Sequence, residues 1–367
     1  MKLVVFGLSI TSTWGNGHGT TYRSLCRALA KRGHSITFFE RDLKWYRENR
    51  DLPDPPFCRL VLYDDWQATL LRVRQELKTC DAVIVGSYFP DSRSALEEVF
   101  SSPAPVKGFY DIDTPITVAA LREHGATDYL RASDLQHLDL YLSFTGGPML
   151  HEITREFGAR RAAPLYCSFD ESQYHPRPPG KRFACDVSYM GTYAADRQPK
   201  LETLLCRPAR QLPSRKFIVA GPQYPRTIGW PANVRRIVHL NARWHPHFYS
   251  SSRLTLNVTR REMVIAGYSP SVRLFEAAAC GAAIASDNWP GLESFFVPGT
   301  EILLPASGDD VMHYVTQLGD QDLRAIGLRA AERVHREHSS SQRARQLEEL
   351  IAAAIAKQPI STTARAS

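Results

Sequence analysis

The sequence has no apolar run long enough to cross a membrane, because no stretch approaches the roughly 18 consecutive apolar residues that a spanning helix needs. Cysteine is scarce too, and its seven copies stand singly, without any C-x-x-C pair. This odd number and spacing argue against a disulfide framework or a zinc site and favour buried free thiols in the cytoplasm. The short apolar start MKLVVFGLSI lacks a small-residue cleavage site after it and predicts a first β-strand rather than a signal peptide.

Runs of one charge sign are missing as well. The net charge of +7 comes from 45 basic and 38 acidic residues dispersed along the chain, without an aromatic–basic nucleic-acid motif. A dispersed excess fits small phosphorylated ligands better than a polymer, so no nucleic-acid partner is expected. The same excess leaves peripheral membrane contact open.

The 367 residues do contain a regular alternation of short apolar runs and helical stretches. Runs such as LVVFGL and DAVIVGS in the first half, and KFIVAGP, GAAIAS and EILLP in the second, predict strands of parallel sheets covered on both faces. The polar, Pro-rich stretch DESQYHPRPPGKRFAC predicts a linker. The expected segments are a first domain at 1–170, a linker at 171–186, a second domain at 187–340, a final helix at 341–356 and a disordered tail at 357–367.

Ligands of open parallel sheets bind beyond the carboxyl ends of the strands, so the residues after each predicted strand are the first candidates. After the first strand, Gly15, Gly17 and Gly19 precede a helix expected to start at Thr20 or the next residue. Glycine lets a backbone approach a ligand closely, and the helix start offers free N–H groups to an anion. His18 in this loop either contacts a substrate or only caps or packs the helix start.

Two carboxylates follow another predicted strand, in the stretch FYDIDTP. Asp111 and Asp113 stand at its end, and Thr114 and Pro115 begin a helix. In the simpler interpretation Asp113 or Thr114 only caps this helix, with Pro115 in its first turn. A capping loop at this edge faces the ligand in any case, so both carboxylates are candidates for proton transfer.

Two stretches of the second half have the features of a phosphate or sugar site. In SYMGTYAADRQP a strand ends at Gly191, and Arg197 lies near the next helix start. A guanidinium there suits a diphosphate, although an ordinary surface arginine is the alternative. The stretch SPSVRLFEAAACGAAIAS predicts a helix that is capped by Ser269 or Ser271, ends at Gly281 and leads into a strand.

One carboxylate, Glu276, stands in this otherwise apolar helix. A buried carboxylate is costly without a partner. Two partners are open: Arg273, three residues earlier on the same helix, or the hydroxyl donors of a ligand.

The stretch SVRLFEAAACGAAIAS resembles the nucleotide-sugar motif R-x-F-E-A-x-A-C-G of GT-B glycosyltransferases. Together with WGNGH, FFERDLKWY, YDIDTP, DLYLSFTGGP, MGTYAADRQP, VAGPQYP, LNVTR and GYSPSVRLFEAAACG, it resembles the CgeB-like (spore maturation protein-like) glycosyltransferases over nearly the whole chain. The resemblance implies an α/β GT-B fold, in which two Rossmann-like domains face each other across a cleft. The N-terminal domain would then bind the acceptor and the C-terminal domain a sugar nucleotide.

The resemblance also implies roles for individual residues. Glu276 matches the residue that accepts hydrogen bonds from both ribose hydroxyls, and Arg197 matches a cation placed against the leaving diphosphate. The implied donor-binding residues are Gly191, Thr192, Arg197, Gly221, Ser271, Val272, Arg273 and Glu276, and the implied substrate contacts are Gly15, Asn16, Gly17, Tyr268 and Ser269. Many retaining members carry a glutamate where this chain has Tyr268, so we assign no stereochemical outcome.

We therefore expect a cytoplasmic glycosyltransferase that uses a UDP or dTDP sugar and an unidentified acceptor, which is a glycan, a lipid-linked glycan, a protein or a small molecule. We expect neither a metal nor another cofactor, because no Asp-x-Asp follows a strand of the donor domain. An inverting enzyme needs a base, and His18, Asp111 and Asp113 are the candidates. The alternatives are an epimerase or hydrolase on the same fold and a non-catalytic scaffold that binds sugar nucleotides.

Overall fold

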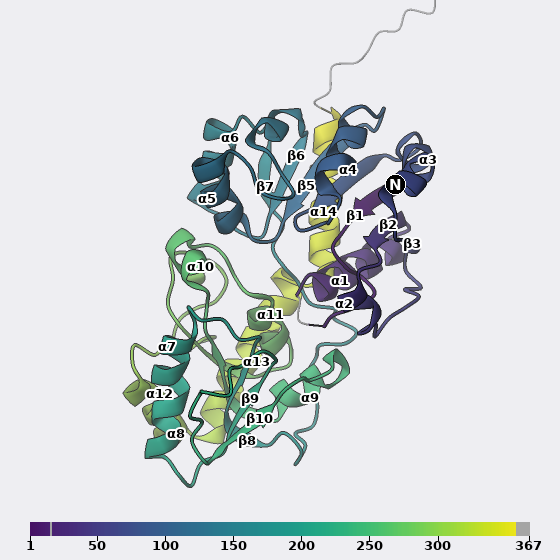
Figure 1. Ribbon diagram of the computed structural model, residues 1–367. Coiled ribbons are helices and arrows are strands. Elements are labelled where there is room, and N and C mark those ends of the chain that lie inside the picture. Colours follow the sequence, from purple (N-terminus) through teal and green to yellow (C-terminus); the bar gives the residue numbers. More distant parts are fainter. Residues whose placement is uncertain (15–16, 357–367) are drawn as a thin grey trace, which may run out of the picture.

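Two separate parallel sheets organise the chain, one in each half (Figure 1). The computed structural model describes residues 1–14 and 17–356. The first sheet has seven strands in the order β3-β2-β1-β4-β5-β6-β7, and the second has five in the order β10-β9-β8-β11-β12. The strand order reverses beside β1 in the first sheet and beside β8 in the second. Ligand sites of open α/β sheets lie at such points.

All neighbouring strands in both sheets are parallel. The strands are β1 (Lys2–Phe6), β2 (Ser35–Arg41), β3 (Arg59–Tyr63), β4 (Ala82–Gly86), β5 (Val106–Asp111), β6 (Leu140–Ser143), β7 (Ala162–Pro164), β8 (Cys185–Met190), β9 (Phe217–Ala220), β10 (Val234–Ile237), β11 (Ser252–Asn257) and β12 (Ala283–Ser286).

Helices connect the strands and cover both faces of each sheet. They are α1 (His18–Lys31), α2 (Lys44–Arg47), α3 (Trp66–Leu77), α4 (Ser92–Phe100), α5 (Thr114–His124), α6 (Pro148–Glu156), α7 (Gln198–Leu201), α8 (Arg207–Gln211), α9 (His245–Ser250), α10 (Arg261–Ala266), α11 (Val272–Ala279), α12 (Gly308–Gln317), α13 (Asp320–Glu337) and α14 (Ser340–Ala356). A π-helical turn, Glu202–Cys206, joins α7 to α8, and short 3-10 turns span Ala132–His137, Ala242–Trp244 and Leu292–Ser294.

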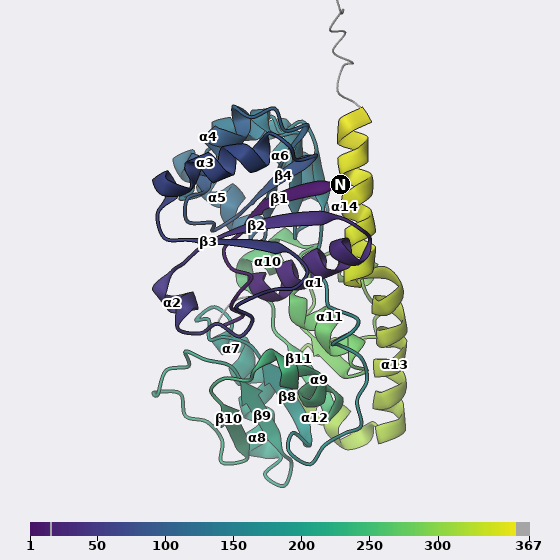
Figure 2. The same ribbon diagram turned by 90° about the vertical axis from the view of Figure 1, so that its right-hand side faces the viewer.

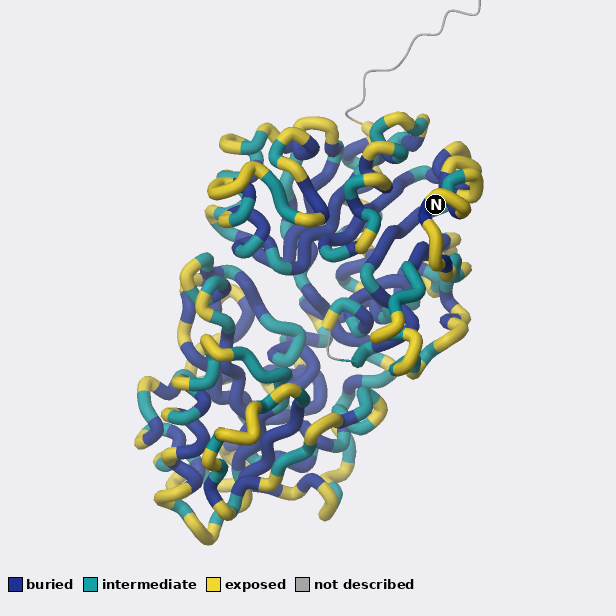
Figure 3. The backbone as a smooth tube through the Cα atoms, in the orientation of Figure 1, coloured by how far each residue is buried: buried dark blue, intermediate teal, exposed yellow. Residues whose placement is uncertain are grey.

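Most strands are nearly continuous apolar runs, because both of their faces are covered, and their residues are buried (Figure 3). The edge strands β3 and β10 are partly exposed. Successive side chains of a strand point to opposite faces. In β1, Leu3 and Val5 belong to the core beneath α1 and α14, whereas Val4 and Phe6 belong to the core beneath α3 and α4. Within the described residues, no helix combines the length and the apolar character that crossing a bilayer requires.

The last helix returns to the first domain. Figure 2 shows α13 running along the C-terminal domain and α14 along the N-terminal domain. Contacts agree with this view, since α13 packs on α11 and β12 whereas α14 packs on α1. The two domains are therefore joined twice, once by the segment after β7 and once between α13 and α14.

These two crossing segments lie side by side. Ser340 N donates to Phe169 O at 3.0 Å, and the buried Arg343 donates to Tyr166 O at 3.1 Å. Arg343 Nη2 also bonds to His338 Nδ1 at 2.6 Å, and the His338 ring stacks on Phe275 at 4.6 Å. A buried cation with several partners thus fixes one crossing against the other.

Two sequence predictions need correction. Helix α1 begins at His18, earlier than predicted, because Thr21 N already donates to Gly17 O at 3.2 Å. The run EILLP forms no strand, and Leu303 makes only a single bridge to Ala285. A turn in which Gly299 N donates to Ile302 O takes up the first residues of this run, so too few residues are left extended to form a strand. The predicted tail at 357–367 lies outside the described residues.

Candidate functional site

A pocket of about 270 Å³, here called the interdomain pocket, lies between the two domains. The N-terminal domain contributes Thr13, Gly17 and Thr20 to its wall. The predicted donor-binding residues that line it are Gly191, Thr192, Arg197, Gly221, Val272, Arg273 and Glu276. A Cβ atom placed on Gly17 would lie 4.0 Å from Val272 Cγ2, so the loop after β1 faces the start of α11 directly.

Glu276 is buried in the second turn of α11, at the wall of this pocket. Burial raises its pKa to about 7, although the Tyr174 hydroxyl and the Arg273 guanidinium favour the charged form. Glu276 Oε2 lies 3.9 Å from Nδ1 of His245, whose own pKa burial lowers to about 4. No lysine or arginine among the described residues pairs with Glu276, so its carboxylate is free to accept hydrogen bonds from a ligand.

The ion pair between Arg273 and Glu276 that the helical spacing allowed does not form. Arg273 instead donates to Met190 O at the end of β8 and to Asn257 Oδ1 at the end of β11, the latter at 2.8 Å. Its guanidinium also lies over the Tyr189 ring, 4.9 Å from the centroid. Arg273 thus ties α11 to two strand ends and leaves Glu276 without this partner.

The loops after β8 and β9 touch at two glycines. Gly221 has a φ of +144°, and a Cβ atom there would lie 1.9 Å from Gly191 O, so neither a side chain nor an ordinary backbone conformation fits. Two residues that the sequence did not single out hold this contact. Tyr224 donates its hydroxyl to Gly191 O at 3.2 Å, and Arg236 donates to the carbonyls of Gly221 and Val219 at 3.0 Å each.

Arg197 lies immediately before α7, beside the Gly191 loop. Its Nη2 donates to Thr192 O at 2.5 Å, and its buried Nε has no hydrogen-bond partner within the described residues. Burial also lowers the pKa of Arg197 from its ordinary value. A partly desolvated guanidinium with an unused donor suits an anion entering the interdomain pocket.

A buried carboxylate that sequence reasoning missed holds the loop after β1. Glu40, near the end of β2, accepts hydrogen bonds from Ile10 N at 2.6 Å and Thr11 N at 3.0 Å. It also accepts from Thr11 Oγ1 at 2.6 Å and Ser9 Oγ at 3.1 Å. The only signal in the sequence was a charge at the end of the apolar run SITFFE.

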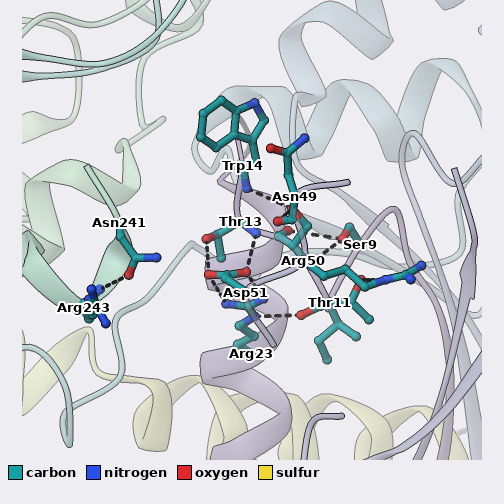
Figure 4. A network of polar contacts seen from close by, with 12 residues as sticks. Ser9, Thr11, Thr13, Trp14, Arg23, Asn49, Arg50, Asp51, Asn241 and Arg243 are labelled. Carbon is teal, nitrogen blue, oxygen red and sulfur yellow. Dashed lines mark hydrogen bonds and ion pairs between the residues drawn. The ribbon is translucent and has the colours of Figure 1, made fainter. Parts of the chain in front are cut away.

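Asp51 continues this support toward the pocket (Figure 4). It accepts hydrogen bonds from Thr13 Oγ1 at 2.8 Å and from both terminal nitrogens of Arg23 at 2.6 and 3.0 Å. Across the cleft, Asn241 Oδ1 caps a short turn by accepting from Arg243 N at 3.1 Å. Thr13, which lines the interdomain pocket, is therefore placed by a charge-assisted network.

The structure brings two of the three predicted catalytic residues together. The His18 ring meets the Tyr88 ring edge-on at 5.5 Å between centroids, and the Tyr88 hydroxyl donates to Asp113 Oδ2 at 3.0 Å. Burial lowers the pKa of His18 to about 4 against the opposing charge of Asp113. Tyr88, which the sequence did not reveal, has a φ of +63°, a strained conformation for a residue with a side chain. Asp113 precedes α5 without capping it through its side chain.

Asp111 adjoins this cluster but lies deeper in the N-terminal domain. It is completely buried, and it accepts hydrogen bonds from Tyr141 Oη at 2.5 Å and from Asp113 N at 3.2 Å. Burial raises its pKa to about 6. Asp111 does not line the interdomain pocket, and neither do His18 and Asp113. The carboxyl group of Asp111 is bonded inside the N-terminal domain, and its predicted catalytic role stays a prediction.

Tyr268 and Ser269 lie in the loop before α11 and contact the N-terminal domain. Tyr268 O accepts from Gly146 N at 2.9 Å, and the Ser269 hydroxyl bonds to Thr145 Oγ1 at 2.9 Å. The Tyr268 ring fits between two glycines, one in each domain, since a Cβ atom on Gly147 or Gly291 would lie 2.3 or 2.4 Å from it. Neither Tyr268 nor Ser269 lines the interdomain pocket.

Three predicted site residues remain: Ser271, Gly15 and Asn16. Ser271 stands directly before α11, but its hydroxyl donates to Asn257 Oδ1 at 2.9 Å and does not cap the helix. Gly15 and Asn16 lie outside the described residues.

Comparison with known proteins agrees with this architecture. A protein-family model described as glycosyl transferase-like matches residues 197–349, and no curated protein matches the chain by sequence. One similar solved structure is sucrose-phosphate synthase from Thermosynechococcus elongatus, with a TM-score of 0.69 and 12% identity over 97% of this chain and 99% of that chain. A second is an alpha-glucosyltransferase in complex with UDP, with a TM-score of 0.67 and 12% identity over 96% of this chain and 100% of that chain. A third is the catalytic domain of Starch Synthase IV from Arabidopsis thaliana bound to ADP and acarbose, with a TM-score of 0.64 and 10% identity over 97% of this chain and 99% of that chain. The fold is therefore GT-B, with two Rossmann-like domains facing each other across a cleft, as predicted.

Proposed function

Because the fold is GT-B, we propose that the protein is a glycosyltransferase of the CgeB-like group whose motifs it resembles. It transfers a sugar from a nucleoside diphosphate sugar, with UDP or dTDP as the nucleotide, to an acceptor hydroxyl or other nucleophile. The observation that carries the proposal is Glu276, a buried carboxylate at the wall of the interdomain pocket with no lysine or arginine partner among the described residues. Two of the similar solved structures contain UDP or ADP, which is consistent with a nucleotide in this pocket.

In this proposal the C-terminal domain binds the donor. The carboxylate of Glu276 accepts hydrogen bonds from the ribose hydroxyls. The free amides at the start of α11, around Ser271 and Val272, bind the diphosphate together with Arg197. When the bond between the anomeric carbon and the diphosphate breaks, negative charge grows on the leaving phosphate, and these positive groups stabilise it. We therefore propose transfer that needs no metal ion.

The N-terminal domain supplies the acceptor side. His18 and Asp113 are the candidates for the base that removes the acceptor proton, and Tyr88 contacts both. Burial lowers the pKa of His18 to about 4, so its ring is neutral at pH 7 and has an unprotonated nitrogen that can act as the proton acceptor. We propose a cytoplasmic enzyme whose acceptor is a glycan, a lipid-linked glycan, a protein or a small molecule, and not a nucleic acid.

Nucleotide binding tests the proposal before any acceptor is known. UDP, dTDP, GDP and ADP are titrated by calorimetry and by thermal unfolding, with and without EDTA. A nucleotide at a hundredfold excess over its Kd stabilises the folded protein by about 2.7 kcal/mol. We expect binding that EDTA leaves unchanged, that Glu276→Gln weakens and that the exposed control Glu293→Gln preserves. Absence of binding by all four nucleotides, or equal binding by both variants, would overturn the proposal.

A further inference from the structure

A second pocket, here called the linker pocket, lies at the opposite end of the C-terminal sheet from the interdomain pocket. It has a volume of about 370 Å³, within the range of small-molecule sites. Its wall comprises linker residues between 176 and 179, residues 250–253 at the start of β11, and the first turns of α13. We propose that this pocket binds a phosphate-bearing small molecule.

The charge of the linker pocket favours an anion. Arg177, Arg253 and Arg324 line it, and Asp320 is the one acidic residue among its lining residues. Asp320 is already paired, because its Oδ1 accepts from Arg253 Nε at 2.5 Å. No carboxylate among the described residues pairs with Arg177 or Arg324. Two arginines are therefore left without a counter-charge at one small pocket.

Arg177 gives the clearest sign of a missing partner. Its Nε atom is buried, and no acceptor within the described residues bonds to it. A buried guanidinium nitrogen without an acceptor costs free energy comparable to a lost hydrogen bond, and a phosphate oxygen would remove that cost. The donors of a guanidinium group match the geometry of phosphate, to which they can bind with two parallel hydrogen bonds.

The linker pocket is also held in shape by hydrogen bonds that leave its arginine side chains unused. Ser250 Oγ accepts from Arg177 N at 3.0 Å and donates to Cys280 O at 3.0 Å. Ser251 Oγ accepts from Gly180 N at 2.9 Å. These bonds fasten the linker to the C-terminal domain and preorganise the wall, which lowers the entropy that a ligand loses on binding.

The linker pocket has a direct connection to the interdomain pocket through α11. Glu276 lines one pocket and Cys280 lines the other, four residues and about 6 Å apart along the helix axis. The linker itself leads to the N-terminal domain. A molecule bound here would therefore connect the segment between the domains to the helix that carries Glu276.

The test is a calorimetric titration of the full chain with inorganic phosphate, in a phosphate-free buffer saturated with UDP. UDP occupies the interdomain pocket under the proposed function, so phosphate binding that persists reports a second site. We expect Arg324→Gln to weaken it at least tenfold (about 1.4 kcal/mol) and Arg177→Gln to weaken it further. The matched control is Arg329→Gln, which removes the same charge from an exposed position of α13 outside the pocket. Thermal unfolding of each variant shows that it folds.

Each other outcome overturns the inference. Phosphate binding that is absent both with and without UDP, or that remains unchanged in Arg177→Gln and Arg324→Gln, shows that the linker pocket takes no phosphate. If UDP does not bind, the proposed donor fails, but the same titration without UDP still decides the question. Phosphate binding lost in Arg197→Gln and kept in Arg177→Gln would then place the anion in the interdomain pocket.

Discussion

Glu40 in the N-terminal domain and Glu276 in the C-terminal domain are both buried, and they differ in what surrounds them. Glu40 is 0% exposed and accepts four hydrogen bonds from the loop after β1. Glu276 is 5% exposed, and only His245, at 3.9 Å, approaches it as a basic partner among the described residues. A buried polar group that is fully bonded stabilises its own fold, whereas one with fewer partners costs free energy. Glu276 has the Tyr174 hydroxyl as a hydrogen-bond partner but fewer partners than Glu40. The difference indicates that Glu40 supports the N-terminal loop, whereas Glu276 keeps acceptor capacity at the wall of the interdomain pocket.

The largest expected effect is on stability and concerns Glu40, whose carboxylate is fully hydrogen-bonded. Glu40→Ala removes the acceptor of the backbone N–H groups of Ile10 and Thr11 and of two hydroxyl groups, so buried donors lose their partner. We expect the free energy of unfolding to fall by about 3 kcal/mol, measured by urea denaturation. A change within about 0.5 kcal/mol would contradict the structural role assigned to Glu40.

The next effect is on binding and concerns Glu276. Glu276→Gln keeps the shape of the side chain but removes the charged acceptor, so UDP should bind about 30-fold more weakly (about 2 kcal/mol). The free energy of unfolding should stay constant or rise, because the variant no longer buries an ionisable group. Calorimetry and urea denaturation on the same sample measure both. Loss of stability without loss of affinity would make the two glutamates equivalent.

The titration of Glu276 makes both stability and UDP affinity depend on pH. Its pKa is raised from 4.5 to about 7, so the folded ligand-free protein holds this proton more tightly than the unfolded chain. Its contribution to stability is therefore complete below pH 4.5 and is lost as the pH rises toward 7. UDP binding has the opposite trend, because ribose hydroxyls donate to the charged carboxylate, and its affinity should rise about fivefold from pH 6 to pH 7.

Titrations of UDP at several pH values measure this dependence. The phosphates of UDP titrate in the same range. Glu276→Gln is the control, because in this variant only the phosphates still contribute to the pH dependence of UDP affinity. His245, the neighbouring titratable group, has a pKa of about 4 and stays neutral throughout this range. Identical pH profiles for the wild-type protein and the variant would remove Glu276 from the binding step.

The smallest expected effect concerns a bonded hydroxyl beside the donor loops. Tyr224→Phe removes the hydrogen bond to Gly191 O and leaves the ring in place, so UDP affinity should fall about fivefold (about 1 kcal/mol). Tyr314→Phe in α12, outside the interdomain pocket, is the matched control. An unchanged affinity in Tyr224→Phe would mean that the glycine contact holds the loops by itself.

The sequence allowed the fold and much of the wall of the interdomain pocket to be predicted, because both depend on local patterns. Gly191, Gly221 and Arg197 follow strand ends, and parallel strands bring their carboxyl ends to one edge of a sheet. Glu276 could be placed on a helix leading into a strand of the same sheet. The alternation of apolar runs was enough to predict these elements, whatever the details of packing.

Interactions that depend on tertiary packing could not be predicted. The spacing of Arg273 and Glu276 fits a helical ion pair, but Asn257 and Met190, distant in sequence, take the guanidinium. Asp111 and Asp113 look equivalent in the sequence, and only the position of Tyr141 shows that Asp111 serves the interior. Tyr88 follows a different strand from both, so nothing in its local pattern indicates that it contacts His18 and Asp113.

The two chain crossings between the domains have a kinematic consequence. Because they are hydrogen-bonded side by side at Phe169 and Ser340, the two crossings act together as one hinge. A rotation about this hinge must also separate Tyr268 O from Gly146 N and the Ser269 hydroxyl from Thr145 Oγ1. Displacement in such a rotation grows with distance from the hinge, so the rim of the cleft farthest from α14 should open widest.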